Sequence, residues 1–159
     1  MGTASSHMSL LLLLLFSVLV SQCSSFFDHV KINIQNDIEG VSFGMRCRSY
    51  DDFLGNRSLH HGEEWHWEFI EIPGITEFWC EFCWYDNQNH HWYSGRSHVY
   101  VAYFWVERYR GYCDGHCQYS ARRDGFYLYR HDKKKWEKRC DWKVDDKKSL
   151  NCYHFRHAN

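Results

Sequence analysis

Short segments in which apolar and polar residues alternate recur along this chain, and this pattern restricts it to a fold built of β-strands. Residues 30–34 (VKINI) alternate without a break, and side chains at every second position of a strand share one face. No apolar pattern with the 3.6-residue period of a helix competes with these segments. The further candidate strands are residues 64–69, 77–84, 97–108, 118–122, 126–130 and 136–144.

Turn-forming residues separate these segments and predict how they connect. Residues 36–40 (NDIEG) predict a turn that returns the chain along residues 41–48 as a hairpin. Asp124-Gly125 favours a tight turn with positive φ at both central residues, which predicts a second hairpin between 118–122 and 126–130. The sequence therefore predicts an all-β fold, a single-domain antiparallel β-sandwich of about eight strands.

The first 25 residues predict a signal peptide. They contain no Lys, Arg, Asp or Glu, and their apolar run at residues 10–20 is too short to span a bilayer. Ser24 and Ser25 predict cleavage near residue 25, which leaves a mature chain with no membrane-inserted segment. We therefore expect a secreted, extracellular protein. Met8 is a second candidate for the natural start, so it stays open whether residues 1–7 are native.

Eight cysteines predict a disulfide-stabilised protein, because exported chains fold in an oxidising compartment. Cleavage near residue 25 removes Cys23. The remaining seven predict three disulfides with either a free thiol or an intermolecular bridge, which leaves a monomer and a disulfide-linked dimer as alternatives. These seven are Cys47, Cys80, Cys83, Cys113, Cys117, Cys140 and Cys152.

Charge is nearly balanced overall, with 19 Lys and Arg against 20 Asp and Glu, but it is unevenly distributed. Residues 131–159 contain nine basic and five acidic side chains. Residues 143–159 form a basic, cysteine-containing tail. Acidic residues interleaved with the lysines favour a solvated C-terminal segment over a polyanion-binding one, and the overall balance argues against a nucleic-acid partner.

Five motifs follow one another over most of the predicted mature chain. They are VKINIQND at 30–37, MRCRSYDDFLG at 45–55, GEEWHWEF at 62–69, FWCEFCW at 78–84 and CDGHCQYSARRDGFYLY at 113–129. In this order they resemble the plant self-incompatibility protein S1 family, the S-protein homologues. Tyr119 departs from the tryptophan that is common in the family at that position, and the tail with Cys140 and Cys152 extends past the family's usual end.

The resemblance implies a β-sandwich over residues 26–142 in which four cysteines take the family's usual positions. From it we expect Cys47 to pair with Cys117 and Cys80 with Cys113. Cys83, Cys140 and Cys152 are then left to supply one further bridge. The resemblance also implies a secreted ligand, not an enzyme, that a cell-surface receptor protein reads in pollen rejection or in related cell–cell signalling.

Polar segments between the predicted strands are the expected receptor contacts, because loops on a rigid scaffold carry recognition. They are residues 55–62, 86–95 and 108–116. Asn56-Arg57-Ser58 is a glycosylation sequon in the first of them, which predicts a glycan on Asn56. The Asp51-Asp52 pair is expected to cap a turn with its side chains.

An alternative function is a secreted carbohydrate-binding or antimicrobial defence protein. It would use exposed aromatic side chains, for which Trp84, Tyr85, Trp92 and Tyr93 are candidates. An extracellular hydrolase has no support, since no paired-carboxylate or Ser/His/Asp arrangement stands out.

Metal and redox sites are the weaker interpretations of the cysteines and histidines. Cys80 and Cys83 have the spacing of a dithiol motif, but residues three apart in a strand point to opposite faces. Together with Cys113 and Cys117 they also resemble a four-thiolate zinc site, although export favours disulfides. The histidines at 60–61, 90–91 and 116 are expected in solvated loops. The sequence therefore predicts no metal and no cofactor.

Overall fold

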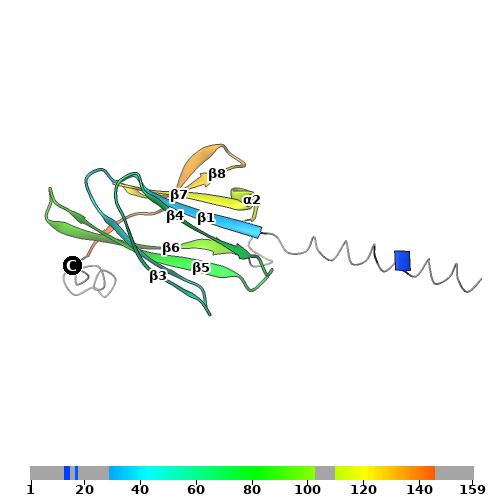
Figure 1. Ribbon diagram of the computed structural model, residues 1–159. Coiled ribbons are helices and arrows are strands. Elements are labelled where there is room, and N and C mark those ends of the chain that lie inside the picture. Colours follow the sequence, from blue (N-terminus) through cyan, green and yellow to red (C-terminus); the bar gives the residue numbers. More distant parts are fainter. Residues whose placement is uncertain (1–12, 15–16, 18–28, 103–109, 146–159) are drawn as a thin grey trace, which may run out of the picture.

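The computed structural model describes residues 13–14, 17, 29–102 and 110–145 and shows two β-sheets packed face to face (Figure 1). The predicted cleavage site, Cys23, Cys152 and residues 146–159 lie outside this part of the chain. Among the described residues, no helix has the length and apolar character needed to cross a membrane.

Each sheet has five strands, which confirms the predicted sandwich. The strand orders are β4-β1-β7-β8-β9 and β10-β6-β5-β2-β3. Neighbouring strands are antiparallel except for the parallel pair of β1 and β7. The elements are β1 (His29–Asn36), β2 (Phe43–Arg48), β3 (Phe53–Leu59), β4 (Glu64–Ile70), β5 (Glu77–Asp86), β6 (His91–Val101), α2 (Arg110–Cys113), β7 (His116–Arg122), β8 (Gly125–Arg130), β9 (Lys135–Cys140) and β10 (Lys143–Val144).

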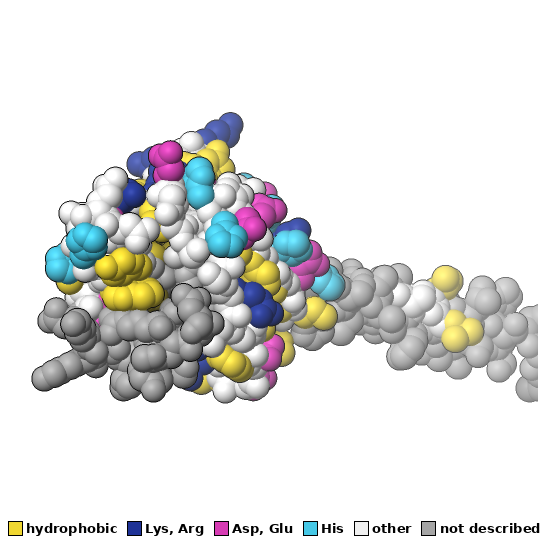
Figure 2. Space-filling view, turned by 60° about the vertical axis from the view of Figure 1, so that its left-hand side comes forward, with side chains coloured by type: hydrophobic (Ala, Val, Ile, Leu, Met, Phe, Trp, Pro, Cys, Tyr) yellow, Lys and Arg dark blue, Asp and Glu magenta, His cyan; other side chains and the backbone are white. Residues whose placement is uncertain are grey.

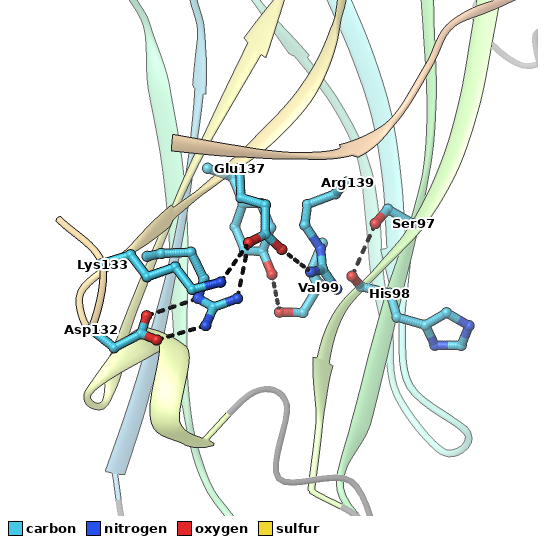
Figure 3. A network of polar contacts seen from close by, with 9 residues as sticks. Ser97, His98, Val99, Asp132, Lys133, Glu137 and Arg139 are labelled. Atoms are coloured by element: carbon cyan, nitrogen blue, oxygen red, sulfur yellow. Dashed lines mark hydrogen bonds and ion pairs between the residues drawn. The ribbon is translucent and has the colours of Figure 1, made fainter. Parts of the chain in front are cut away.

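The core lies between the two sheets, as alternation predicts. In β1, Val30, Ile32 and Ile34 are buried, whereas the residues between them face outward. Tyr119 is buried as well, and its ring stacks on Phe126 at a centroid distance of 5.0 Å. Its hydroxyl donates a hydrogen bond of 2.6 Å to the carbonyl oxygen of Val99 in the other sheet (Figure 3). Tyr119 therefore joins the two sheets.

The predicted hairpin between residues 30–34 and 41–48 is wrong, because β1 and β2 lie in different sheets. The buried side chain of Asn36 stabilises the connection by which the chain passes from the sheet of β1 to the sheet of β2. Its Nδ2 donates to the carbonyl oxygens of Val41 (3.1 Å) and Leu59 (2.9 Å), and its Oδ1 accepts from the Ile38 amide (2.9 Å). These bonds satisfy backbone groups that a hairpin ladder would otherwise satisfy.

The second predicted hairpin is confirmed, but its turn differs from the predicted type. β7 and β8 pair with Arg122 opposite Gly125. The central residues are therefore Arg123 and Asp124, and neither has a positive φ. Glycine is required at 125 for another reason: a Cβ there would lie 2.7 Å from the carbonyl oxygen of Cys140 in the neighbouring strand.

Three other predicted boundaries need correction. β6 begins at His91 rather than at residue 97, and the predicted continuation over 103–108 lies outside the described residues. The predicted strand 136–144 divides into β9 and β10, which belong to different sheets. Trp142 lies between them, and its Nε1 donates to the carbonyl oxygen of Arg122 (2.6 Å). β3 occupies residues that were expected to form a loop.

Candidate functional site

Two disulfides are fixed within the described residues, and both contradict the expected pairing. Cys47 is bonded to Cys80, which lies opposite it on the adjacent strand with a Cα separation of 4.1 Å. Cys113 is bonded to Cys117 across the connection from α2 to β7. The expected pairing failed because the sequence does not show that β2 and β5 are neighbours.

The remaining described cysteines differ in state. Cys83 is disulfide-bonded. Cys140, which was counted among the disulfide candidates, is free, and burial raises the pKa of its thiol to about 11. It is therefore protonated and unreactive at neutral pH. Because Cys80, Cys113 and Cys117 are oxidised, they do not supply the thiolates of a dithiol motif or a zinc site.

The expected recognition loops are largely strand. Residues 55–59 belong to β3 and residues 91–95 to β6, which leaves a short turn at 87–90. Residues 108–109 lie outside the described part, and α2 begins at Arg110. Asn56 is exposed, but it lies on the edge strand β3 rather than in a loop. Its glycosylation remains a prediction.

The candidate aromatic residues are also placed differently from the expectation, whereas His60, His61 and His90 lie exposed between strands as expected. Trp84 is buried and stacks on the half-buried Tyr93, so it offers no exposed ring. Tyr85 and Trp92 are half-buried. His116 lies in β7, where desolvation lowers its pKa, with a further contribution from Lys31. Along the described residues, no group of three or more His, Cys, Asp or Glu side chains is arranged to hold a metal ion.

An apolar pocket lies at the end of the sandwich where β1 begins and β4 ends. Its volume is about 440 Å³, and it is enclosed by the β2–β3 turn and by the longer β4–β5 turn. Phe69 and Phe78 form part of its wall, with their ring centroids 4.5 Å apart. The lining consists of Ser49, Tyr50, Asp51, Asp52, Phe69, Ile70, Ile72, Ile75, Thr76, Glu77 and Phe78.

Large apolar side chains around this pocket are exposed in the free protein. Tyr50 is 75% exposed, Ile75 65%, Ile70 51% and Ile72 45%, and Phe53, which follows the first turn, is 60% exposed. Concentrated exposure of this kind marks a surface that binds another molecule. We call the exposed residues at this end, together with the cavity, the apolar pocket.

Local hydrogen bonds hold the first turn rigid. The hydroxyl of Ser49 donates to Asp51 Oδ1 (2.7 Å) and accepts from the amide of Asp52 (3.0 Å). The Ser49 amide also donates to the Asp52 carbonyl (2.8 Å). The serine, not the predicted aspartate pair, thus caps the turn, and Tyr50 is largely exposed with its ring edge-on to Trp79 at a centroid distance of 5.3 Å.

The second turn is fixed by its own bonds and by strand β6. The amide of Ile72 donates to Thr76 Oγ1 (2.8 Å), and the amide of Ile75 donates to the Ile72 carbonyl (3.1 Å). The Ala102 amide, at the end of β6, donates to the Thr76 carbonyl (2.9 Å). Gly74 has φ 81°, a conformation that favours glycine. Ile72 and Ile75 are therefore presented in fixed positions.

Two exposed acidic side chains lie beside the apolar surface. Asp51 and Asp52 are exposed on the first turn, and the buried Glu77 lies 2.6 Å from His98 Nδ1. Among the described residues no Lys or Arg lines the pocket, although the guanidinium carbons of Arg48 and Arg96 lie 5.2 and 5.9 Å from the ring of Trp79, which Tyr50 contacts. The arrangement favours a partner that combines apolar side chains with positive charge.

Most residues of the apolar pocket were not predicted as a binding site, although the sequence contains a signal for them. Ile72-Pro-Gly-Ile75 places two large aliphatic residues around the strongest turn-forming pair in the chain, and Tyr50 precedes two aspartates. Large apolar residues in a polar turn have no strand face on which to become buried. That mismatch indicates an exposed apolar surface.

Comparison with known proteins assigns the fold and the motif order to a family. The profile described as Plant self-incompatibility protein S1 matches residues 31–142. The chain belongs to this family. Among S-protein relatives, Self-incompatibility protein S1 of Papaver rhoeas is 27% identical over 127 residues, which cover 79% of this chain and 86% of the relative. S-protein homolog 29 of Arabidopsis thaliana is 27% identical over 144 residues, covering 87% and 97%.

A further S-protein relative has higher identity over a shorter stretch. S-protein homolog 20 of Arabidopsis thaliana is 36% identical over 101 residues, covering 60% of this chain and 66% of the relative. In this S-protein family member, the profile match includes both turns of the apolar pocket and all four cysteines of the two described disulfides.

Proposed function

We propose that this S-protein family member is a secreted ligand that a cell-surface receptor recognises through the apolar pocket. The observation that carries the proposal is the cluster of exposed apolar side chains held by two rigid turns. A surface with fixed turns loses little conformational entropy on binding. The predicted signal peptide and the relative named for self-incompatibility support a role outside the cell in recognition between cells.

The pocket predicts the chemistry of the receptor segment that enters it. Apolar walls accept an aliphatic or aromatic side chain, while the exposed carboxylates of Asp51 and Asp52 attract a lysine or arginine next to it. Full burial of an isoleucine side chain stabilises a complex by roughly 1.5–3 kcal/mol. Ile75 is the exposed aliphatic residue with the most surface left to bury in this pocket.

Replacing Ile75 with serine is expected to weaken binding to receptor-bearing cells by about tenfold or more. Ile75 is 65% exposed before binding, so the change removes contact with the partner and leaves the fold intact. The measurement is saturation binding of labelled, disulfide-bonded protein to intact cells of the responding tissue. Ile75→Ser and Tyr50→Ala are compared with the wild type.

Val144→Ser is the matched control, because Val144 is a 54% exposed aliphatic residue on the distant strand β10. It should bind as the wild type does. Equal affinities for the wild type and both pocket variants would show that the receptor contacts another surface. Absence of saturable binding by the wild type itself would remove the receptor proposal.

A further inference from the structure

The outer face of the β8–β9 hairpin carries a second surface, with chemistry opposite to that of the apolar pocket. In the register of β8 and β9, Tyr129 lies opposite Trp136, and their ring centroids are 5.4 Å apart. The guanidinium carbon of Arg122 lies 4.7 Å from the ring centroids of both Tyr127 and Trp136. Three rings and one cation thus form a continuous surface, on which Trp136 is 37% exposed.

This surface is strongly basic. Residues 122–139 contain eight Lys and Arg but only three Asp and Glu. In Figure 2, Lys and Arg side chains lie beside hydrophobic ones at the top of the molecule, where Figure 1 places the β8–β9 hairpin. We call this surface the aromatic-basic face; its residues are Arg122, Tyr127, Tyr129, Trp136 and the neighbouring turn residue Lys134, whereas Lys135 alternates to the opposite face of β9.

The three carboxylates of this stretch are already engaged. Asp132 and Glu137 bind the buried Arg130. Asp124 accepts a hydrogen bond from the Tyr127 hydroxyl and lies 3.2 Å from Lys138 Nζ. Their negative charges are therefore directed to other cations and do not neutralise the face.

Its cations, by contrast, remain available. Among the described residues, Arg122 and Lys134 form no ion pair. Within the described part of the chain, Arg122 donates from Nε to the Ser120 hydroxyl (3.0 Å), and its terminal nitrogens donate to no other side chain or carbonyl there. Stacking on two rings fixes the guanidinium plane in advance, so a carboxylate could meet it at little entropic cost.

We propose that the aromatic-basic face binds an acidic polysaccharide, a chain of uronic acid residues. The C–H faces of the sugar rings would pack on Trp136 and Tyr129, since aromatic faces attract weakly positive C–H groups. The carboxylates would pair with Arg122 and with the turn residue Lys134. The face shares no residue with the apolar pocket, so binding a matrix polymer would leave the receptor site open.

The shape of the face favours an extended polymer over a membrane. Tyr127 and Tyr129 are half-buried and Trp136 is partly covered, so no large apolar side chain stands far out of the sheet. Insertion at a bilayer interface needs such projecting side chains. A flat row of rings with cations beside it matches a ribbon-like sugar chain that carries a carboxylate on each unit.

Titration calorimetry of the folded chain with polygalacturonate tests the proposal. Binding is expected with the free-acid polymer and about tenfold or more weaker with the fully methyl-esterified polymer, which has the same backbone without charge. Raising NaCl from about 50 to about 500 mM should weaken binding by a similar factor, because exposed charges are screened. Phosphatidylserine vesicles and a single-stranded oligonucleotide are the comparison anions.

Variants on the aromatic-basic face should distinguish the contribution of aromatic stacking to binding from the contribution of charge. Trp136→Ala is expected to weaken binding about tenfold and Lys134→Asn severalfold, whereas Trp136→Phe should retain most of it. Asparagine suits position 134, where φ is 51°. The exposed turn variant Lys134→Asn keeps the proposal testable if Trp136→Ala unfolds.

Two controls distinguish this proposal from the receptor proposal. Lys31→Ala removes a cation from the same sheet's outer face, where Lys31 pairs with Glu68, and should leave polygalacturonate binding unchanged. Tyr50→Ala, in the apolar pocket, should weaken cell binding only. Equal binding of both polymer forms, equal loss in Lys31→Ala, or preference for vesicles or oligonucleotide would overturn the proposal.

Discussion

Replacing Arg130 with methionine is expected to lower the free energy of unfolding by about 2 kcal/mol. The Arg130 side chain is only 6% exposed, but its partners Asp132 and Glu137 are 39% and 32% exposed, so the change removes charge-assisted hydrogen bonds without leaving a buried charge. Its Nε and Nη2 donate to Asp132 (2.8 and 2.6 Å), and its Nη1 donates to Glu137 (2.9 Å). The guanidinium also stacks on Tyr112 and so ties α2 to the β8–β9 hairpin.

Lys133→Ala is the matched control, since Lys133 pairs with the same carboxylate of Glu137 from an exposed position (Figure 3). An exposed pair of this kind contributes about 0.5 kcal/mol or less. Urea unfolding of the disulfide-bonded proteins measures both variants. Similar small losses for Arg130→Met and Lys133→Ala would contradict the role assigned to the buried arginine.

Acid provides a second readout of the same contact. The hydrogen bond from Arg130 lowers the pKa of Asp132 below its ordinary value of 3.8. A lowered folded-state pKa contributes stability above the ordinary value, and this contribution is lost as pH falls through the lowered pKa. The wild type and Arg130→Met should therefore differ most above about pH 4 and converge at lower pH.

Removing the Cys47–Cys80 disulfide is expected to destabilise the protein by about 4 kcal/mol, and removing Cys113–Cys117 by about 2 kcal/mol. The first bridge closes a loop with a sequence separation of 33, and the second one of only 4. A longer loop loses more entropy when it is closed in the unfolded chain. Cys47–Cys80 also lies in the core and joins the paired strands β2 and β5.

The comparison uses the double variants Cys47→Ala/Cys80→Ala and Cys113→Ala/Cys117→Ala, so that no new free thiol confuses the result. Both are measured by thermal and urea unfolding under oxidising conditions. Cys140→Ala is the control, since Cys140 is free and half-buried. A larger loss from the short bridge than from the long one would contradict the chain-entropy argument for this fold.

Alternation in the sequence predicted most strand positions, but it did not predict their neighbours. The pattern of Val30, Ile32 and Ile34 identifies one buried face and carries no information on which strand pairs with β1. In the structure its partners are β4 and the parallel β7, which follow much later in the chain. The hydrogen bonds of the Asn36 side chain to Val41 and Leu59 stabilise the connection from β1 to the other sheet. The turn residues alone do not show this connection, and they therefore predicted the wrong hairpin.

The same limit explains the cysteines and the candidate site. Cys47 and Cys80 pair because β2 and β5 are adjacent, and adjacency depends on the whole topology. The apolar pocket depends on two turns distant in sequence that meet at one end of the sandwich. Tyr50 and Ile75 both lie exposed at this end because the two turns meet there. The sequence shows only that each is a large apolar residue within a turn.

Recognition by a receptor outside the cell requires that the chain be exported and oxidised. The direct measurement is peptide mass spectrometry of the native protein from its source tissue, with free thiols alkylated before reduction. We predict recovery from the extracellular fluid of a chain that begins near residue 26, with Cys47 bonded to Cys80, Cys113 bonded to Cys117 and Cys140 alkylated. An intracellular chain with its N-terminal segment intact and these four cysteines reduced would contradict the account.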